Sequence, residues 1–396
     1  MRVLQISANW GLGGPGGVEK DIYYTLVNNG HECVIAYGRG SVPEDINSYK
    51  IGSKLNSYRH YAKATLFDDM GFASSKETKR LVSYIDDLKP DVIQLHNLLG
   101  YYINIEVLFN YLCCSGIPVV WTVHDCWLIT GHCINFDRIS CEKWKTCCHS
   151  CPLVRDYPKS LIDRSRRNYE KKKNILGKVK NITYVTPSIW LSNILKESFL
   201  SNQHIITIQN GIDLDMFRPK KSKLREMLKL EGKKVILFVA SVWNDMKGLG
   251  IIKQLSRIVS SECILVVIGE HSDNIVGDNV LSFRRTDDIE KLVEWYSTAD
   301  VFVNPTLGDN FPTVNIEALA CGTPVVTNMT GGSPEIVGDD CGRICKSRTP
   351  EELYQRIREC EKADISEEIC RKRAKTFDRN ITFNRYIELY ARLIGH

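Results

Sequence analysis

Short apolar segments alternate with amphipathic segments along almost the whole chain. The apolar segments are rich in β-branched residues, a pattern typical of parallel strands that are buried on both faces. We predict strands at Arg2–Ser7, Glu32–Tyr37, Val92–His96, Val119–Val123, Thr183–Thr186, Val235–Ala240, Cys263–Ile268, Val280–Phe283, Val301–Asn304 and Pro324–Thr327. The segments between them have helical spacing, as in Val18–Asn28, Lys79–Leu88, Ile289–Thr298 and Thr313–Ala320. This alternation predicts an α/β fold.

The strand–helix series is interrupted near the middle of the chain and then begins again. The turn-forming run Asn210-Gly211-Ile212-Asp213 and the polar run Arg218-Pro219-Lys220-Lys221 mark the interruption. We therefore predict two doubly wound, Rossmann-like domains, residues 1–210 and 211–378. The last segment, 379–396, contains a helix with one apolar face, which we expect to pack back on the first domain.

Composition narrows the class of protein further. The chain has 396 residues, of which 43% are hydrophobic and 25% charged, so disordered, collagen-like and coiled-coil proteins are excluded. The net charge of +5 permits anionic partners without indicating a nucleic-acid-binding protein. No apolar run approaches the roughly 18 residues of a membrane-spanning helix, and the first residues do not resemble a signal peptide. We expect a cytoplasmic protein, with peripheral attachment to the inner face of the membrane as an option.

A glycine-rich turn follows the first predicted strand. Gly11, Gly13 and Gly16 fit the GxGxxG pattern of dinucleotide-binding proteins, but the second strand ends in Ala36-Tyr37-Gly38-Arg39, without the carboxylate that would bind a ribose. Nicotinamide binding is therefore disfavoured. The turn remains compatible with anion binding by backbone N–H groups at the start of a helix, or with a tight turn that binds nothing.

The most informative segment runs from Asn304 to Val326, where a strand, a polar loop and a helix follow one another. The first N–H groups of the helix, at Thr313 and Val314, form a second candidate anion site. Asp309 precedes the helix and Glu317 lies one turn inside it, so both carboxylates can border one cleft. Carboxylates suit sugar hydroxyls because they accept hydrogen bonds from vicinal O–H groups.

In these residues the chain resembles the retaining GT-B glycosyltransferases of glycosyltransferase family four. The signature of that family has two acids separated by seven residues, an Ala-Cys-Gly-Thr-Pro-Val-Val run and a Gly-Gly-x-Pro-Glu turn. Further matches are Gly16-Gly17-Val18-Glu19, Gly30-His31-Glu32, Val123-His124-Asp125, Asn210-Gly211-Ile212-Asp213 and Lys247-Gly248. The chain is most similar to the colanic-acid-type transferases of surface polysaccharide assembly. The resemblance implies two Rossmann-like domains that face each other across a cleft, with the acceptor on the first.

The resemblance also implies a role for each matching residue. Glu317 would hold the nucleotide ribose, Lys247 would neutralise the diphosphate, and His124 would lie beside the transferred sugar. Asp309 would contact the donor sugar, so Asp309, Lys247 and His124 are the candidate catalytic residues. The remaining donor-binding candidates are Gly16, Gly17, Asn310, Phe311, Thr313 and Val314.

The chain departs from the family at two positions. Asp309 stands where the family has Glu, which shortens the reach to the sugar by one methylene. Val242 stands where the family usually has Arg, five residues before Lys247, so one cation for the diphosphate is missing or comes from elsewhere. Electrostatics supports the interpretation independently, because a fixed Lys and helix N-termini stabilise charge that develops on a departing diphosphate.

These features together predict a retaining hexosyltransferase. It would move a sugar from a UDP- or GDP-linked donor to a saccharide acceptor, expected to be lipid-linked, in bacterial surface polysaccharide biosynthesis. No cofactor is expected in catalysis, since no acidic pair demands a metal ion. The alternatives are another GT-B enzyme, either a nucleotide-sugar epimerase or a phosphorylase, and a non-enzymatic, zinc-stabilised binding protein.

Two further features lie in the second quarter of the chain. Cys133, Cys141, Cys148 and Cys151, within an insertion at about 126–158, have a spacing that suits a closed structural zinc site. Reduced or disulfide-paired cysteines are the alternative. Basic residues crowd the segment 164–180, either as a solvated helix face or as a surface for anionic lipid headgroups.

Overall fold

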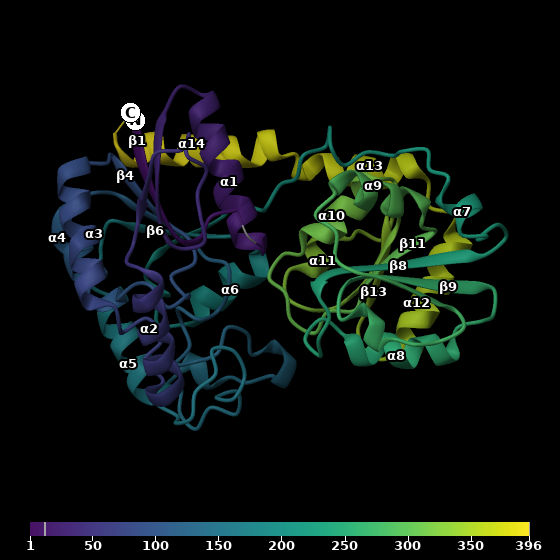
Figure 1. Ribbon diagram of the computed structural model, residues 1–396, viewed down its shortest axis with the longest axis horizontal. Helices are drawn as coiled ribbons and strands as arrows, with labels where there is room; N and C mark the ends of the chain where they lie inside the picture. The colour runs from purple at the N-terminus through teal and green to yellow at the C-terminus, as the bar shows by residue number, and fades with distance from the viewer. Residues whose placement is uncertain (12, 396) are drawn as a thin grey trace. The chain divides into compact units, whose positions relative to one another are not determined.

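The computed structural model describes residues 1–11 and 13–395, which form two compact α/β units (Figure 1). Unit 1 comprises Met1–Ile208 and Phe383–His396, and unit 2 comprises Gln209–Thr382. Leu12, in the glycine-rich turn, and His396 lie outside the described residues. The α/β prediction is confirmed, because each unit is built on one parallel sheet covered by helices on both faces.

The sheet of unit 1 has seven strands in the order β3-β2-β1-β4-β5-β6-β7. The strands are β1 (Arg2–Asn9), β2 (Glu32–Arg39), β3 (Ser48–Lys50), β4 (Val92–Leu95), β5 (Val119–Thr122), β6 (Ile182–Thr186) and β7 (His204–Thr207). The helices are α1 (Gly13–Asn28), α2 (Lys54–Phe67), α3 (Ser75–Leu88), α4 (Ile105–Ser115), α5 (Ser165–Leu176), α6 (Ile189–Glu197) and α14 (Arg379–Leu393), with short 3-10 helices at Asp137–Ile139 and Lys143–Lys145.

Successive residues of these strands contact opposite layers of helices. Val3 of β1 belongs to the core formed with α1 and α14, whereas the next residue, Leu4, belongs to the core formed with α3, α4 and α5. Both residues are fully buried. The continuous apolar runs in the sequence arise from this two-sided burial.

Unit 2 repeats the architecture with six strands in the order β10-β9-β8-β11-β12-β13. The strands are β8 (Lys234–Val242), β9 (Cys263–Glu270), β10 (Val280–Phe283), β11 (Val301–Asn304), β12 (Val325–Asn328) and β13 (Gly342–Cys345). The helices are α7 (Leu224–Met227), α8 (Leu249–Ile258), α9 (Ile289–Thr298), α10 (Thr313–Ala320), α11 (Ser333–Ile336), α12 (Pro350–Ala363) and α13 (Glu367–Ala374), with 3-10 helices at Ser272–Asn274 and Lys375–Phe377.

Each sheet has one point at which the strand order reverses. In unit 1 the reversal lies between β1 and β4, and in unit 2 it lies between β8 and β11. Connections from these neighbouring strands leave in opposite directions, which opens a crevice at the carboxyl ends of the strands, where α/β proteins commonly bind ligands. The loops at these two edges are therefore the first places to look for a site.

Three short strands were missed by the sequence analysis: β3, β7 and β13. All three lie at an edge of their sheet, where one side of the strand is unpaired. Edge strands are only partly buried, as the exposed and intermediate residues of β3 and β7 show, so they lack a continuous apolar run.

The C-terminal helix α14 completes the core of unit 1 (Figure 1). The buried hydroxyl of Tyr390 donates to Gln94 Oε1 at 2.8 Å, and the hydroxyl of Tyr386 lies 3.1 Å from Thr122 Oγ1. Gln94 and Thr122 belong to the central strands β4 and β5, so the last helix seals the sheet, in line with its predicted return to the first domain. Within the described residues, every helix is too short or too polar to cross a membrane.

Candidate active site

Loops that follow β11 and β12 interlock at the carboxyl edge of the sheet in unit 2. Gly331 has a φ of +53°, and a Cβ atom there would lie 1.6 Å from the carbonyl oxygen of Asp309. The Gly332 N–H donates to the Asn310 carbonyl at 3.0 Å. Only glycine at position 331 lets the two chains approach so closely, and their contact fixes the backbone that carries Asp309 and Asn310.

The loop that follows β8 joins the same assembly. Gly248 has a φ of +83°, and a Cβ atom there would lie 2.4 Å from the Pro305 carbonyl oxygen. The Leu307 N–H donates to the Met246 carbonyl at 2.8 Å. Lys247 lies between these two contacts, so its backbone is held against the loop that carries Asp309.

Lys247 and Asp309 form an ion pair at this edge. Lys247 Nζ lies 2.6 Å from Asp309 Oδ2, although the two residues are 62 positions apart in the chain. The side chains retain 38% and 22% of their exposure, so solvent or a ligand can reach both. The pair offers a positioned ammonium group and a carboxylate that can accept further hydrogen bonds.

Glu317 is the fifth residue of α10, one turn after the helix begins, and is partly buried. Its Oε2 accepts a hydrogen bond from the hydroxyl of Tyr296, on α9, at 2.9 Å. Burial raises the pKa of Glu317, while hydrogen bonds from Tyr296 and Thr313 act in the opposite direction. The Tyr296 contact orients the carboxylate, which has capacity to accept additional hydrogen bonds.

The N-terminus of α10 supplies backbone donors beside these side chains. Thr313 and Val314 are its first two residues and are partly exposed, and their N–H groups have no acceptor one turn earlier in the helix. Phe311 corrects an expectation, because its side chain is only 4% exposed and packs edge-on against Phe377, with ring centroids 5.7 Å apart. Its ring therefore supports the loop from below and does not line an open surface.

The glycine-rich turn of unit 1 forms the start of α1. The helix begins at Gly13, five residues before the predicted start at Val18, so Gly16 and Gly17 lie inside it. A Cβ atom at Gly16 would lie 2.9 Å from the backbone of Gly11, whereas one at Gly17 would meet open space. Position 16 thus needs glycine for packing, and position 17 leaves the adjacent surface clear.

Two histidines that follow the neighbouring strands β4 and β5 of unit 1 contact each other. His96 Nε2 lies 2.7 Å from Gln5 Oε1, and His96 Nδ1 lies 3.3 Å from His124 Nε2. Burial lowers the pKa of His124 to about 4 and that of His96 well below its usual value, so both rings are neutral near pH 7. The amide of Gln5 donates to Cys33 Sγ, which leaves Gln5 Oε1 to accept from His96. The network therefore assigns the proton of His124 to Nε2.

Acidification is expected to destabilise unit 1 through His124. Its pKa is about 4 in the folded protein and 6.5 in the unfolded chain, so the unfolded chain binds more protons between these values. Stability is complete above pH 6.5 and is lost as the pH falls. We expect the free energy of unfolding to fall by ~1 kcal/mol between pH 6.5 and pH 5.5 from this group. Urea titrations at several pH values measure the free energy of unfolding of the wild type and of His124→Asn. We expect this free energy to fall more steeply on acidification in the wild type, and the same pH dependence in both proteins would contradict the prediction.

Glu19, on α1, is a buried acid that the sequence motif contained without revealing its environment. The residue is fully buried, and neither carboxylate oxygen has a hydrogen-bond partner among residues 1–11 and 13–395. The nearby Ser7 hydroxyl donates instead to the Asn9 carbonyl at 3.1 Å. Burial raises the pKa of Glu19 to about 8, and Ser7 only partly opposes that rise. The acid is thus largely protonated at neutral pH.

Glu19→Gln is expected to change the pH dependence of stability. In the wild type the folded state binds more protons than the unfolded state between pH 4.5 and pH 8, so stability falls as the pH rises through this range. The free energy of unfolding of the variant minus that of the wild type should increase by ~2 kcal/mol from pH 5 to pH 7. Urea denaturation at both pH values measures it. Glu44→Gln, at an exposed position, is the control and should show no such trend.

Within each unit the structure brings together part of the predicted set. In unit 2, Lys247 and Asp309 touch, and Asn310, Thr313 and Glu317 lie on the same loop–helix segment. Sequence reasoning missed two residues that position the predicted ones: Tyr296, which contacts Glu317, and His96, which contacts His124 in unit 1. His96 could have been found, because one predicted strand ends in His96 and His124 directly follows the next one, Val119–Val123. Tyr296 carries no such signal, since a tyrosine on an amphipathic helix is indistinguishable from a core residue.

The four predicted zinc-ligating cysteines line one small cavity. Cys133, Cys141, Cys148 and Cys151 surround it, together with His132, whose Nδ1 lies 2.6 Å from Asp68. The four cysteines are free thiols, which favours reduced cysteines over disulfides. As the side chains stand, no set of three or more His, Cys, Asp or Glu residues in the described part of the chain is arranged to hold a metal ion. The zinc site stays a prediction from spacing.

The basic segment 164–180 is less available to a membrane than its composition indicates. Lys172 does not belong to an exposed basic face, contrary to expectation. It is buried, and its Nζ donates to the carbonyls of Trp127 and Thr130 at 2.6 and 3.0 Å. Burial lowers the pKa of Lys172 to about 7. Arg167 pairs with Asp69 at 2.6 Å. This part of α5 is thus engaged within unit 1.

Comparison with protein families identifies the chain. A family model described as Glycosyltransferase Family 4 matches residues 13–216, just over half of the sequence. The chain belongs to glycosyltransferase family 4. A second model, described as Glycosyl transferases group 1, matches residues 233–362, which include the Lys247–Asp309 pair and Glu317. The recognition of a glycosyltransferase of this family is confirmed.

Individual relatives agree with this membership. Over 390 residues the chain is 25% identical to the colanic acid biosynthesis glycosyl transferase WcaC of Escherichia coli, covering 93% of this chain and 92% of that protein. It is 24% identical over 254 residues to the MMP alpha-(1->4)-mannosyltransferase of Mycolicibacterium hassiacum, covering 60% and 55% of the two chains.

Solved structures show the same fold. Sucrose-phosphate synthase from Thermosynechococcus elongatus superposes with a TM-score of 0.74 at 16% identity, covering 100% of this chain and 99% of that one. Alr3699/HepE from Anabaena, solved in complex with UDP-glucose, superposes with a TM-score of 0.68 at 15% identity, covering 99% and 100%. The GT-B architecture of two Rossmann-like domains is confirmed.

Proposed function

We propose that this family 4 member transfers a hexose, with retention of configuration, from a nucleoside diphosphate sugar to a saccharide acceptor. The observation that carries the proposal is the Lys247–Asp309 pair held beside the N-terminus of α10 and Glu317. This small region offers a cation, backbone donors and two carboxylates, which are the groups that a diphosphate linked to two sugars requires. The UDP-glucose complex of Alr3699/HepE supports a nucleotide-sugar donor.

Each group has a distinct part in donor binding. The Lys247 ammonium and the N–H groups of Thr313 and Val314 bind the diphosphate, since both favour negative charge. Glu317, oriented by Tyr296, accepts hydrogen bonds from the ribose hydroxyls. Asp309 accepts from hydroxyls of the hexose, and its ion pair with Lys247 holds the carboxylate in place.

The transfer itself needs no metal ion in this proposal. The bond between the anomeric carbon and the phosphate oxygen breaks, and its electron pair stays on the diphosphate. The acceptor oxygen bonds to the same face of the anomeric carbon, and its proton passes to the departing phosphate oxygen. Lys247 and the α10 N-terminus stabilise the charge that develops on that oxygen. His124, which is neutral near pH 7, is proposed to lie beside the transferred sugar and transfers no proton in the reaction.

Similarity to WcaC, whose name places that protein in colanic acid biosynthesis, supports a proposal for the biological setting. We propose that the acceptor is a saccharide of bacterial surface polysaccharide assembly, carried on a lipid, and that the donor is linked to UDP or GDP.

The decisive experiment measures turnover across a panel of UDP- and GDP-hexoses. Release of nucleoside diphosphate is followed with and without saccharide acceptors, and the product anomer is assigned by NMR. We expect one donor to be consumed faster with an acceptor and the product to keep the donor configuration. A sugar altered without any acceptor would indicate an epimerase. Absence of both binding and turnover would favour a non-enzymatic binding protein.

A further inference from the structure

A large cavity lies at the carboxyl end of β2 in unit 1, and none of the residues assigned to the donor lines it. Its volume is about 740 Å³, which suits a small molecule. The wall is formed by the end of β2, by β3, by the first half of α2 and by Tyr101. The residues that line it are Gly38, Arg39, Gly40, Ser41, Lys50, Lys54, Ser57, Tyr58, Tyr61 and Tyr101.

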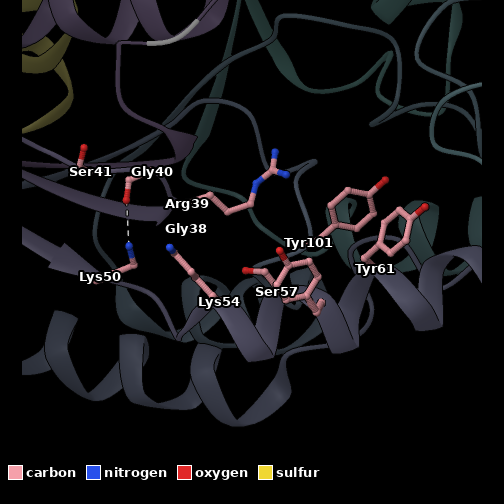
Figure 2. A pocket seen from close by; sticks show the side chains of 10 residues that line it. Gly38, Arg39, Gly40, Ser41, Lys50, Lys54, Ser57, Tyr61 and Tyr101 are labelled. Atoms are coloured by element: carbon pink, nitrogen blue, oxygen red, sulfur yellow. Dashed lines mark hydrogen bonds between the residues drawn. The ribbon is translucent and has the colours of Figure 1, made fainter.

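The lining combines positive charge with aromatic surface. Figure 2 shows Lys50 and Lys54 at one end of the cavity, Tyr61 and Tyr101 at the other, and Arg39 between them. The lining includes three cations and no carboxylate. Lys50 Nζ donates to the Gly40 carbonyl at 2.9 Å, and Lys54 forms no ion pair within the described residues. Such a wall attracts an anion, because the lining itself contains no acid to neutralise the cations.

Arg39 is the best placed of the three cations. Its guanidinium lies 5.6 Å from the ring centroid of Tyr101, and its buried Nε lacks a hydrogen-bond partner in the part of the chain that the structure describes. A planar guanidinium with unused donors matches the two oxygens of a phosphate or carboxylate. Because Nε is shielded from solvent, an anion in the cavity would accept from the terminal N–H groups of Arg39, which form no hydrogen bond within the described residues.

The tyrosines provide a separate recognition surface. The rings of Tyr61 and Tyr101 meet edge to face, with centroids 5.2 Å apart, and the side chain of Tyr58 is 70% exposed. Tyr101 has a φ of +63°, in the left-handed region that non-glycine residues rarely adopt. Aromatic faces pack well against the C–H face of a sugar ring, while the hydroxyl groups stay hydrated.

We propose that this cavity binds an acidic saccharide acceptor, with its phosphate or carboxylate on Arg39 and Lys54 and its sugar ring on the tyrosines. The role of this ligand as the acceptor rests on the proposed transferase activity, whereas its binding to the cavity does not depend on that activity. It narrows the acceptor from any saccharide to a negatively charged one.

Binding is tested without donor, by calorimetry with glucose, glucose 1-phosphate, glucuronic acid and inorganic phosphate. We expect glucose 1-phosphate or glucuronic acid to bind at least about tenfold more tightly than glucose. The anion that binds better identifies the acidic group. Inorganic phosphate should bind more weakly than glucose 1-phosphate, because it lacks the ring. Equal affinity for glucose and both acidic sugars would overturn the proposal.

Variants locate the binding. Arg39→Gln and Lys54→Gln should each weaken the acidic sugar about tenfold, and Tyr61→Ala should weaken glucose and its acidic forms alike. Lys63→Gln, on an exposed position of α2 outside the lining, is the matched control and should bind normally. Because Lys54 is exposed, its variant is expected to fold. Unchanged affinity in both cation variants would overturn the proposal even if donor turnover is observed, whereas loss of donor turnover alone would overturn only the proposed function.

Discussion

Replacing Lys247 by alanine is expected to slow sugar transfer about a hundredfold or more at saturating donor. The ammonium is held 2.6 Å from Asp309 by two loops whose backbones interlock, so no solvent reorganisation is needed when negative charge develops on the leaving diphosphate. A positioned group of this kind contributes ~3 kcal/mol to lowering the barrier. The effect should be large here because Val242 stands where the family usually provides a second cation.

The control separates catalysis from folding. The Lys247–Asp309 pair is partly exposed, so its loss should cost less than about 1 kcal/mol of stability, and thermal unfolding should be nearly unchanged. Lys253→Ala, at an exposed position of α8, removes the same charge elsewhere in unit 2 and should retain full activity. If Lys247→Ala turns over at the wild-type rate, the assignment of the diphosphate cation is wrong.

Glu317→Gln is expected to weaken binding of the nucleoside diphosphate by about tenfold to a hundredfold. The substitution replaces a charged acceptor by a neutral amide in a partly buried position, where hydrogen bonds to a charged group contribute ~1.5–3 kcal/mol. Gln keeps an acceptor for the Tyr296 hydroxyl, so the fold should persist. Calorimetry with UDP and GDP measures the loss directly and also identifies the base.

Two companion variants sharpen this result. Glu317→Leu leaves the buried Tyr296 hydroxyl without an acceptor and should lower stability by ~1–3 kcal/mol in addition to weakening the nucleotide. Glu351→Gln, at an exposed position of α12, removes an equivalent charge and should bind nucleotide normally. Wild-type affinity in Glu317→Gln would show that this carboxylate does not contact the ribose.

The sequence predicted the architecture well because buried parallel strands leave a clear signal. Every predicted strand, from Arg2–Ser7 to Pro324–Thr327, overlaps a strand of one of the two sheets. The signal is weak in edge strands such as β7. It is also weak at the start of α1, where Pro15 and four glycines give the sequence of a turn although the segment is helical. Local propensity reads such a segment as a turn, whereas packing against the sheet makes it helical.

The candidate site was less accessible to sequence reasoning, since its organisation depends on contacts between distant residues. The spacing of Asp309 and Glu317 places both on one loop–helix segment, and the structure agrees. The ion pair of Asp309 with Lys247, the support of Glu317 by Tyr296 and the burial of Phe311 all depend on tertiary packing. A linear pattern does not encode which side of a loop faces the core.

The return of α14 to unit 1 has a consequence for biosynthesis. Ribosomes deliver this helix after the whole of unit 2, yet Phe383, Tyr386 and Tyr390 complete a hydrophobic layer whose earlier members, from Val3 to Ile208, emerge before unit 2. Unit 2 is continuous in sequence and is finished earlier. Until α14 has been synthesised, one face of the sheet in unit 1 is covered only in part, so a chain that stopped after unit 2 would leave the earlier-made unit incomplete.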